Sequence, residues 1–403
     1  MHAHYDYIIA GGGGSGLSLL RTLLCHERLR HKRILVIDRE FKLQNDRTWC
    51  FWATPEELAA YNLPVQHEWE HLSFITDEQQ VTHSIHPYRY YCLRSGAFYE
   101  AAREEARAFP NVTFLQTTIE DICEHPERPQ LVSEDGIFSA DFIFSSLADT
   151  NAIRDKSTYF LSQRFLGWFV RAPYPVFDTR AVRFMDFRIS QDQGTQFFYV
   201  LPFSQTEALI ESTAFVPSGS ATPDFQPQLR SYLQQYYDLN EYEISETESG
   251  NIPMSSYDFG RPRSSRIVPI GTAGGCTKSS TGYTFKTIQQ HSHQIVNQLE
   301  NGKHPTPWQR NSRFRFYDRV LLHLLQERGQ NAGKKIFTPL LGEGELPHVL
   351  RFLEEKTHPL QELALFLHLP WGMFLKAAAT TWKRSLQPEK TTLHEPQTTL
   401  LPS

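Results

Sequence analysis

Two glycine-rich turns, far apart in the chain, have residue types that let a backbone come close to a phosphate group or a flat ring. The first spans residues 11–16 and the second spans residues 271–285. Glycine lacks the Cβ atom that would block a close approach, and the first N–H groups of a following helix supply hydrogen-bond donors. One such turn is a weak signal, whereas two of them favour a cofactor held between them.

The first turn lies within a strand–turn–helix–strand pattern. Residues 5–10 predict a strand, residues 17–24 a helix, and residues 33–38 a second strand that ends in Asp38. An acid about 20 residues past the last glycine is where the dinucleotide fold places its ribose ligand. The pattern therefore predicts a dinucleotide-binding βαβ unit.

The glycines of this turn fit the motif G-x-G-x-x-G, with Gly11, Gly13 and Gly16 at its three fixed positions. In that motif they permit a tight turn, the approach of a pyrophosphate, and close packing of helix on strand. Arg39 beside Asp38 leaves NADP open as the dinucleotide. The second glycine-rich turn favours FAD, because flavin enzymes commonly complete the cofactor site with a late element of the same domain.

The second turn has a similar setting. It follows the apolar residues 267–270 and leads into residues 286–299, where apolar side chains at 288, 295, 296 and 299 can share one helical face. This is again a strand, a turn of small residues and a helix, so the chain is expected to return here to the cofactor domain.

Composition narrows the class of protein. The chain has 403 residues, of which 40% are hydrophobic and 21% are charged, as in a globular protein of two or three domains. A net charge of −5 argues against a nucleic-acid partner. The five scattered cysteines form no C-x-x-C pair, and the pairs His2/His4 and His291/His293 lack further ligands, so no metal site is expected. The N-terminus leads directly into a strand, which predicts a cytoplasmic protein without a signal peptide.

The pattern of elements predicts an α/β fold, in which a Rossmann-like FAD-binding domain carries an inserted antiparallel sheet and is followed by a helical region. Residues 41–97 are interpreted as loop-rich, 98–109 as a helix, and 111–116 and 138–145 as further strands of the first sheet. Short apolar runs at 167–171, 181–185, 195–201 and 207–213 predict the antiparallel sheet, and 225–237 a helix. The predicted divisions are 1–160 and 261–302 for the cofactor domain, 161–260 for the β-rich substrate domain, 303–385 for the helical region, and 386–403 for a tail.

The helical region contains one segment that could contact a membrane. Residues 360–379 are apolar but are broken by Pro370 and Gly372, and no run approaches the about 18 apolar residues of a membrane span. A buried pair of helices is one interpretation. The other, which we favour, is a helix at the bilayer surface with Trp371 and Lys376 at the interface.

Taken together, these motifs resemble those of the bacterial lycopene β-cyclase family of flavoproteins. The match extends over about residues 5–300 and is carried by residues 46–49 (Asp-Arg-Thr-Trp), 199–203 (Tyr-Val-Leu-Pro-Phe), 209–213 (Leu-Ile-Glu-Ser-Thr), 251–254 (Asn-Ile-Pro-Met) and 274–285. The resemblance implies reduced FAD as cofactor, NAD(P)H as external reductant, lycopene as substrate, and a peripheral position at the inner membrane. It also implies a cyclisation of lycopene ends to β-rings with no net change of oxidation state.

The resemblance implies that Glu211 is the catalytic acid. A carboxyl group with apolar neighbours such as Leu209 and Ile210 is favoured in its neutral form, so it can donate a proton near neutral pH. Strand alternation puts Glu211 on the same face as Glu207, Leu209 and Thr213. That face is the more polar one, and the pattern alone leaves a solvent-facing or salt-bridged glutamate as the alternative.

The remaining predicted site residues come from the same motifs. The predicted cofactor contacts are Gly11, Gly13, Gly16, Asp38, Arg47, Gly274, Gly275, Lys278 and Gly282. The predicted substrate-pocket residues are Trp49, Tyr199, Pro202, Phe203, Tyr283 and Phe285. Lys278 could neutralise flavin or pyrophosphate charge or be a surface lysine, and the aromatic residues could support a cation through their ring faces or simply pack.

Two alternative functions share this fold. One is an FAD-dependent monooxygenase or other oxidoreductase acting on a hydrophobic substrate, which would consume NADPH in proportion to product. The other is a carotenoid-binding flavoprotein without enzymatic activity. The sequence leaves the number of cyclised ends, β- or ε-ring product, the proton donor (flavin or Glu211) and the oligomeric state open.

Overall fold

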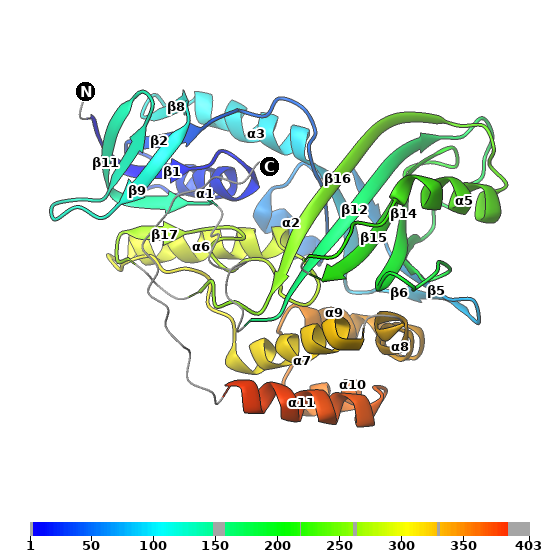
Figure 1. Ribbon diagram of the computed structural model, residues 1–403. Coiled ribbons are helices and arrows are strands. Elements are labelled where there is room, and N and C mark those ends of the chain that lie inside the picture. The colour runs from blue at the N-terminus through cyan, green and yellow to red at the C-terminus, as the bar shows by residue number, and fades with distance from the viewer. Residues whose placement is uncertain (1–2, 148–157, 218, 261–263, 329–330, 386–403) are drawn as a thin grey trace.

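The computed structural model describes residues 3–147, 158–217, 219–260, 264–328 and 331–385 (Figure 1). The predicted tail, residues 386–403, lies outside them. The fold is α/β, as predicted, with a mainly parallel sheet, a large mainly antiparallel sheet and a group of helices at the end of the chain.

The first sheet forms the core of the predicted cofactor domain. In spatial order it contains β8 (Val112–Gln116), β2 (Ile34–Asp38), β1 (Ala3–Ala10), β11 (Gly136–Ser145), β10 (Gln130–Ser133) and β9 (Ile119–Cys123), with β17 (Ile267–Pro269) also paired to β11. The strands β8, β2, β1, β11 and β17 are parallel, whereas β10 and β9 are antiparallel. The central strands β1 and β2 are apolar runs buried by layers on both faces.

Three helices cover one face of this sheet. They are α1 (Gly14–Cys25), α3 (Ser95–Arg107) and α6 (Phe285–Glu300). Their apolar faces share one core with β1, β2 and β11. The prediction that the chain returns to this sheet is confirmed, because β17 pairs with β11 and is followed by the late turn and α6.

The second sheet lies on the other side of the molecule (Figure 1). Its order is β16 (Glu243–Ser255), β12 (Phe160–Arg171), β15 (Glu207–Pro217), β14 (Thr195–Pro202), β13 (Val182–Asp186), β5 (His71–Ile75) and β6 (Gln80–Ser84). All neighbouring strands are antiparallel except β13 and β5. The predicted strands at 167–171, 181–185, 195–201 and 207–213 and the helix α5 (Phe225–Tyr237) are confirmed.

The prediction that residues 41–97 are loop-rich is wrong. This segment contains β3 (Thr48–Ala53), α2 (Pro55–Tyr61), β4 (His67–Trp69), β5, β6 and β7 (Arg89–Arg94). The strands β3, β7 and β4 form a small antiparallel sheet, while β5 and β6 join the second sheet through β13. Except for the hairpin of β5 and β6, these strands pair with segments distant in sequence, and the local pattern did not reveal them.

The two faces of the second sheet contact different layers. On β15, Leu209 and Phe215 belong to a core shared with the small sheet and the C-terminal helices. The alternate residues Ala208 and Ile210 belong to a core beneath α5. We call the first the inner face and the second the outer face, and the period of two along a strand fixes which residues reach each.

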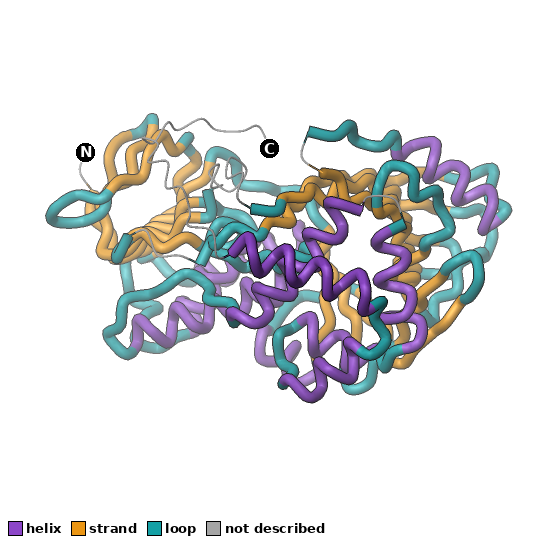
Figure 2. The backbone as a smooth tube through the Cα atoms, turned by 60° about the horizontal axis from the view of Figure 1, so that its bottom comes forward, coloured by secondary structure: helices purple, strands orange, loops and turns teal. Residues whose placement is uncertain are grey.

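The region 303–385 is mainly helical in its described part, as predicted, and covers the inner face (Figure 2). It contains α7 (Ser312–Arg328), α8 (Ala332–Thr338), the π-helical turn η1 (Pro339–Glu343), α9 (Leu346–Leu353), α10 (Pro359–Phe366) and α11 (Trp371–Ser385). The break expected near Pro370 falls between α10 and α11. Within the described part of the chain, no helix combines the length and apolar character needed to cross a bilayer.

Two Asp-x-Arg pairs near β13 test how much a buried ion pair stabilises this sheet. The Asp186 carboxylate is fully buried, accepts two hydrogen bonds from Arg188 at 2.9 and 2.6 Å, and accepts a third from the Tyr232 hydroxyl of α5 at 2.6 Å. Asp178 and Arg180 have nearly the same bidentate geometry, at 2.9 and 2.8 Å, but are exposed.

We expect Asp186→Ala to lower the free energy of unfolding by about 3–5 kcal/mol, because Arg188 and Tyr232 would lose a buried anionic partner. The matched change Asp178→Ala should have little effect, because water and salt screen an exposed pair. Urea denaturation midpoints of the two variants measure the difference. Equal losses would show that burial is not what gives the Asp186 pair its importance.

Candidate active site

The first glycine turn has the backbone geometry of a phosphate-binding loop. Gly11 has a φ of +109°, and an added Cβ atom on Gly16 would lie 2.0 Å from the carbonyl oxygen of Gly11. Neither position can accept a side chain without rearrangement. At Gly13, which caps the N-terminus of α1, an added Cβ would meet no atom of the described residues within 4 Å. This open space beside a helix N-terminus can accept an anionic group.

Asp38 lies beside this turn at the end of β2. Its Oδ2 accepts a hydrogen bond from the Gly12 N–H at 2.6 Å, and its Oδ1 accepts one from the Glu40 N–H at 3.2 Å. The carboxylate therefore holds the turn against the end of β2. Its predicted contact with a ribose stays a prediction.

The two glycine turns touch each other. Gly271, with a φ of +63°, approaches so closely that an added Cβ would lie 2.9 Å from the Cβ of Ser15. An added Cβ on Gly274 would lie 2.3 Å from the carbonyl oxygen of Pro269, which keeps the late turn compact. From α6, the Gln289 side chain donates a hydrogen bond to Ser18 of α1 at 2.8 Å. Segments about 260 residues apart thus form one site.

The late turn also meets the inner face of the second sheet. Gly275 and Gly282 have φ values of +85° and +76°, and an added Cβ on Gly282 would lie 2.5 Å from the side-chain oxygen of Gln163 on β12. Around this contact, the polar atoms Gln163 Oε1, Thr281 Oγ1 and Trp52 Nε1 are buried and have no hydrogen-bond partner among the described residues. Such atoms are costly unless a ligand or water pairs with them, so they mark a place that suits a polar ligand.

Lys278 has a different environment from the one predicted. Its ammonium group lies 3.0 Å from Asp318 Oδ1 of α7 and 3.3 Å from Glu355 Oε1, and only 5% of the side chain is exposed. Ser280 donates to the same Asp318 at 2.6 Å, and Arg310 binds Glu355 at 2.6 Å. The charge of Lys278 is balanced within the protein, so the lysine ties the late turn to the helical region and is not available to neutralise a cofactor.

Arg47 is exposed at the edge of the site. Its guanidinium donates hydrogen bonds to the backbone carbonyls of Asp46 at 2.6 Å and of Ser249 at 3.5 Å. It therefore bridges the 46–49 segment and the edge strand β16, and its predicted cofactor contact stays a prediction.

Glu211 lies at the centre of the inner face. On β15 it is paired with Gly167 of β12 on one side and with Tyr199 of β14 on the other. The Thr213 hydroxyl donates a hydrogen bond to its Oε1 at 2.6 Å, and no cation of the described residues lies within ion-pair distance. Burial, followed by the charge of Glu248, raises the pKa of Glu211 to about 8. The alternative of a salt-bridged glutamate is therefore wrong, and the carboxyl group is neutral at neutral pH.

Aromatic rings surround this carboxyl group. Burial raises the pKa values of Tyr90, Tyr199 and Tyr283, which lie close enough to influence one another's ionisation. The ring of Tyr283 is stacked 6.4 Å from that of Phe184 and packs edge-on to Trp52 at 4.7 Å. Their faces form an apolar surround with available π-electrons, which is what a cationic intermediate requires.

Two of the predicted pocket residues belong elsewhere. The rings of Trp49 and Phe285 stack at 4.7 Å and pack with Phe98 in the core of the first domain. An added Cβ on Gly14 would lie 2.8 Å from the Trp49 ring, so this tryptophan borders the start of α1. The structure therefore groups Trp49 and Phe285 with the cofactor turn and not with Glu211.

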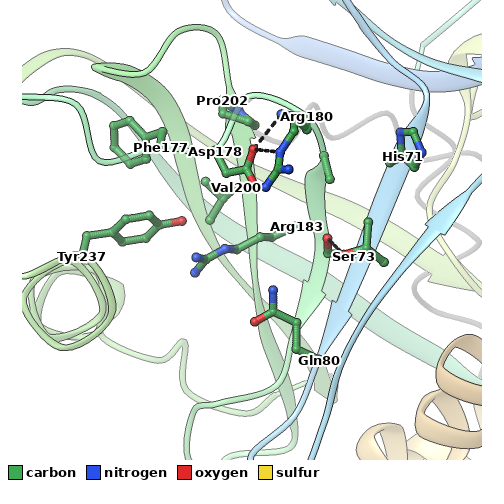
Figure 3. Close-up of a pocket in the computed structure, with 12 residues that line it drawn as sticks. His71, Ser73, Gln80, Phe177, Asp178, Arg180, Arg183, Val200, Pro202 and Tyr237 are labelled. Atoms are coloured by element: carbon green, nitrogen blue, oxygen red, sulfur yellow. Dashed lines mark hydrogen bonds and ion pairs between the residues drawn. The ribbon is translucent and has the colours of Figure 1, made fainter.

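Pro202 and Phe203 lie on opposite sides of the sheet. Pro202 lines a pocket of about 340 Å³ on the outer face, together with Val200, Arg183 and Tyr237 (Figure 3). Because alternate residues point to opposite faces, Pro202 points away from Glu211. Phe203 follows the strand and packs against Phe169 and His67 at the rim of the inner core.

Sequence reasoning missed four residues of the site: Trp52, Tyr90, Phe184 and Glu248. Glu248 lies on β16, directly opposite Gly167, and so shares the inner face with Glu211. Its position three residues before the 251–254 segment was a usable signal, but only if β16 had been predicted as a strand. Trp52 and Tyr90 lie on the paired strands β3 and β7, which were not predicted, and Phe184 lies on the predicted strand β13 but outside the motifs.

Comparisons with known structures place this architecture among flavoprotein folds. A geranylgeranyl bacteriochlorophyll reductase-like protein from Thermoplasma acidophilum superposes with a TM-score of 0.58 at 10% identity, covering 95% of this chain and 98% of that one. A probable FAD-dependent monooxygenase from Pseudomonas aeruginosa gives a TM-score of 0.54 at 14% identity, covering 87% and 100%. At these identities the likeness concerns the fold alone.

Sequence comparisons identify the family. A lycopene β-cyclase from Pantoea ananas is 25% identical over 300 residues, which cover 71% of this chain and 72% of that protein. The family model described as lycopene cyclase protein matches residues 6–379, well beyond the approximate limit of 300 inferred from the motifs. The chain therefore belongs to the lycopene cyclase family.

Proposed function

We propose that this protein is a lycopene β-cyclase that converts the acyclic ψ-ends of lycopene to β-rings by proton-initiated, non-redox cyclisation. The observation that carries the proposal is a neutral carboxyl group, Glu211, facing an aromatic surround next to the two glycine turns. A carboxyl group whose pKa is about 8 keeps its proton at neutral pH and can give it to an alkene.

The reaction adds one proton and removes another. Protonation of the terminal double bond by Glu211 leaves a carbocation, attack by a second double bond closes the ring, and loss of a proton restores neutrality. No electrons are gained or lost. The Glu211 carboxylate left after the first step stabilises the cation electrostatically in a site of low polarity. The rings of Tyr199, Tyr283 and Phe184 exclude water that would otherwise capture the cation.

FAD is the cofactor that fits the two turns. The open space at Gly13 would take the pyrophosphate, Asp38 would contact the ribose, and the late turn with its unpaired polar atoms would hold the isoalloxazine end. When bound in its reduced form, FAD would supply an electron-rich ring that stabilises a nearby cation. NAD(P)H would serve only to keep that flavin reduced.

The substrate is dissolved in membrane, and the outermost helices have a surface that suits a bilayer. Among the residues that the structure describes, nine large hydrophobic side chains are exposed, and six of them belong to the last two helices and their link: Leu360, Leu363, Leu367, Trp371, Leu375 and Trp382. They belong to α10, α11 and the link between them, at the bottom of Figure 1. The helix α11 has no acidic residue and carries Lys376 and Lys383. We propose that this face lies on an anionic lipid surface.

The role of Glu211 is tested with Glu211→Gln. The variant should keep its fold and bound FAD, because glutamine has the same size and still accepts the hydrogen bond of Thr213. Cyclisation should fall by about 10²–10⁴-fold, the usual contribution of a general acid. Pigment chromatography and mass measure the outcome, since a cyclised product has the mass of lycopene. Unchanged activity would exclude Glu211 as the acid, and NADPH consumed in proportion to product would favour an oxidoreductase.

The predicted FAD site is tested by comparing two glycines of the same turn. Gly13 has φ −85° and open space around it, so Gly13→Ala should fold normally but weaken FAD binding roughly tenfold or more, or about 1.4 kcal/mol. Gly16→Ala should instead destabilise the apoprotein, because its Cβ would collide with the Gly11 carbonyl. FAD titration and thermal unfolding of the apoproteins separate the two effects. Undiminished FAD affinity in Gly13→Ala would contradict the assignment.

The lipid-facing surface is tested by cosedimentation of the holoenzyme with vesicles of phosphatidylcholine and phosphatidylglycerol. Burying a leucine contributes about 1.5–3 kcal/mol, so Leu367→Glu should reduce binding at least roughly tenfold. Leu43→Glu is the control, because Leu43 is 82% exposed but lies far along the chain from α10 and α11. Equal effects of the two substitutions, or no binding by the unmodified enzyme, would refute this surface.

A further inference from the structure

A second carboxyl side chain, that of Glu248, lies on the same face of the sheet as Glu211, on the other side of the strand β12. Glu211 on β15 and Glu248 on β16 are both paired with Gly167 of β12, so all three lie in one row on the inner face. An added Cβ on Gly167 would lie 2.9 Å from Leu209 Cδ1, 3.2 Å from Glu248 Cγ and 3.7 Å from Glu211 Cβ. The glycine therefore adds no side chain of its own between the two acids, and Leu209 borders the gap above it.

Glu248 is held in place by the 46–49 segment. The Thr48 hydroxyl donates a hydrogen bond to Glu248 Oε2 at 2.6 Å, from the first residue of β3. Arg94 lies nearby but binds Glu246 and stacks 3.9 Å over the Phe169 ring. Burial, and to a smaller extent the charge of Glu246, raises the pKa of Glu248, while the Thr48 hydrogen bond and the nearby charges of Arg94 and Arg47 act in the opposite direction. The arrangement thus favours the ionised form of Glu248 over that of Glu211.

The other titratable groups near Glu211 are neutral at neutral pH. Tyr199 comes from β14, Cys50 from β3, Tyr90 from β7 and Tyr283 from the late turn. Burial raises the pKa of each of these tyrosines, and a hydrogen bond with Cys92 together with burial raises the pKa of the Cys50 thiol. Glu248 is therefore the charged neighbour with which Glu211 interacts across the sheet.

We propose that Glu248 is a positioning residue whose ionised carboxylate, fixed by Thr48 across the Gly167 gap, keeps the proton on Glu211. Two carboxyl groups that share a poorly solvated space do not both ionise readily. Each accepts one hydroxyl hydrogen bond at 2.6 Å, and the nearby cations Arg94 and Arg47 make Glu248 the one that loses its proton first. The role of Glu248 rests on the proposed function in one respect only, namely that the proton of Glu211 is the one used in cyclisation.

The change Glu248→Gln tests this role because it removes the charge and keeps the acceptor for Thr48. With the like charge gone, the pKa of Glu211 should fall. Because the protonated form of Glu211 is active, the alkaline limb of the pH–rate profile should move to lower pH by roughly one unit or more. A purely structural role for Glu248 would lower activity at every pH and leave the limb in place.

Two further variants keep the test valid if Glu248→Gln does not fold. Thr48→Val removes the hydrogen bond that favours ionised Glu248, so it should move the limb in the same direction. Glu246→Gln is the matched control: this acid is two residues away on β16 and binds Arg94, and its loss should not move the limb to lower pH. A limb that stays in place in both Glu248→Gln and Thr48→Val overturns the proposal.

A direct titration separates this proposal from the proposed function. In the FAD-loaded enzyme, the infrared band of the protonated carboxyl group that disappears in Glu211→Gln reports Glu211 without any turnover. We expect that band to be lost at lower pH in Glu248→Gln than in the unmodified enzyme. If the band moves but lycopene is not cyclised, the positioning role stands and the cyclase proposal fails. If lycopene is cyclised and the band does not move, the positioning role fails.

Discussion

The structure depends on the contact between two turns that are about 260 residues apart in the chain. Gly271 can come within van der Waals distance of Ser15 only because neither turn places a bulky side chain between them. This contact brings the chain back to its first sheet at β17, so everything between β11 and β17 must leave the first sheet and return. The second sheet is the main part of that excursion. The late turn, which follows β17, brings Tyr283 close to Glu211.

The inner face shows how the protein tolerates an acid without a counter-ion. An unpaired ionised carboxylate would be costly in this environment, so Glu211 stays protonated instead. Nearby, Lys278, Asp318, Glu355 and Arg310 are buried charges that neutralise one another. The late turn therefore has two different environments. At Lys278 its charge is neutralised and the turn is anchored to α7, whereas its other end faces the Glu211 carboxyl group, which has no cationic partner. A carboxyl group with a strongly shifted pKa, such as Glu211, is typical of a functional site.

Local patterns predicted the parts of the fold that local interactions stabilise. The βαβ unit and α5 were predicted with nearly correct bounds, because their apolar periodicity and turn glycines are visible within short windows. The strand β16 was missed because its partner β12 is distant in sequence and because β16 is polar along much of its length. The strand β5 pairs with the distant β13 but also with its neighbour β6. The same distinction applies to the candidate site. Motifs singled out Glu211 and Tyr199, whereas the position of Glu248 beside them is visible only from the pairing of β16 with β12. The prediction for Pro202 was wrong because successive side chains along a strand point to opposite faces of the sheet.

The fold is that of flavoproteins that include redox enzymes, yet the chemistry proposed here transfers only protons. The difference need not lie in the nucleotide-binding turn, whose glycines are dictated by backbone geometry that any such fold must satisfy. It lies in what the second sheet presents to the site. A redox enzyme requires a substrate atom that accepts or donates electrons, whereas a cyclase requires a neutral acid, an apolar surround and exclusion of water. In the row formed by Tyr199, Glu211, Gly167 and Glu248, the two carboxyl groups serve the first requirement and the ring of Tyr199 serves the second. In this molecule, specialisation of the shared fold is therefore a property of the register of three adjacent strands, β16, β12 and β15, and of the single glycine at their centre.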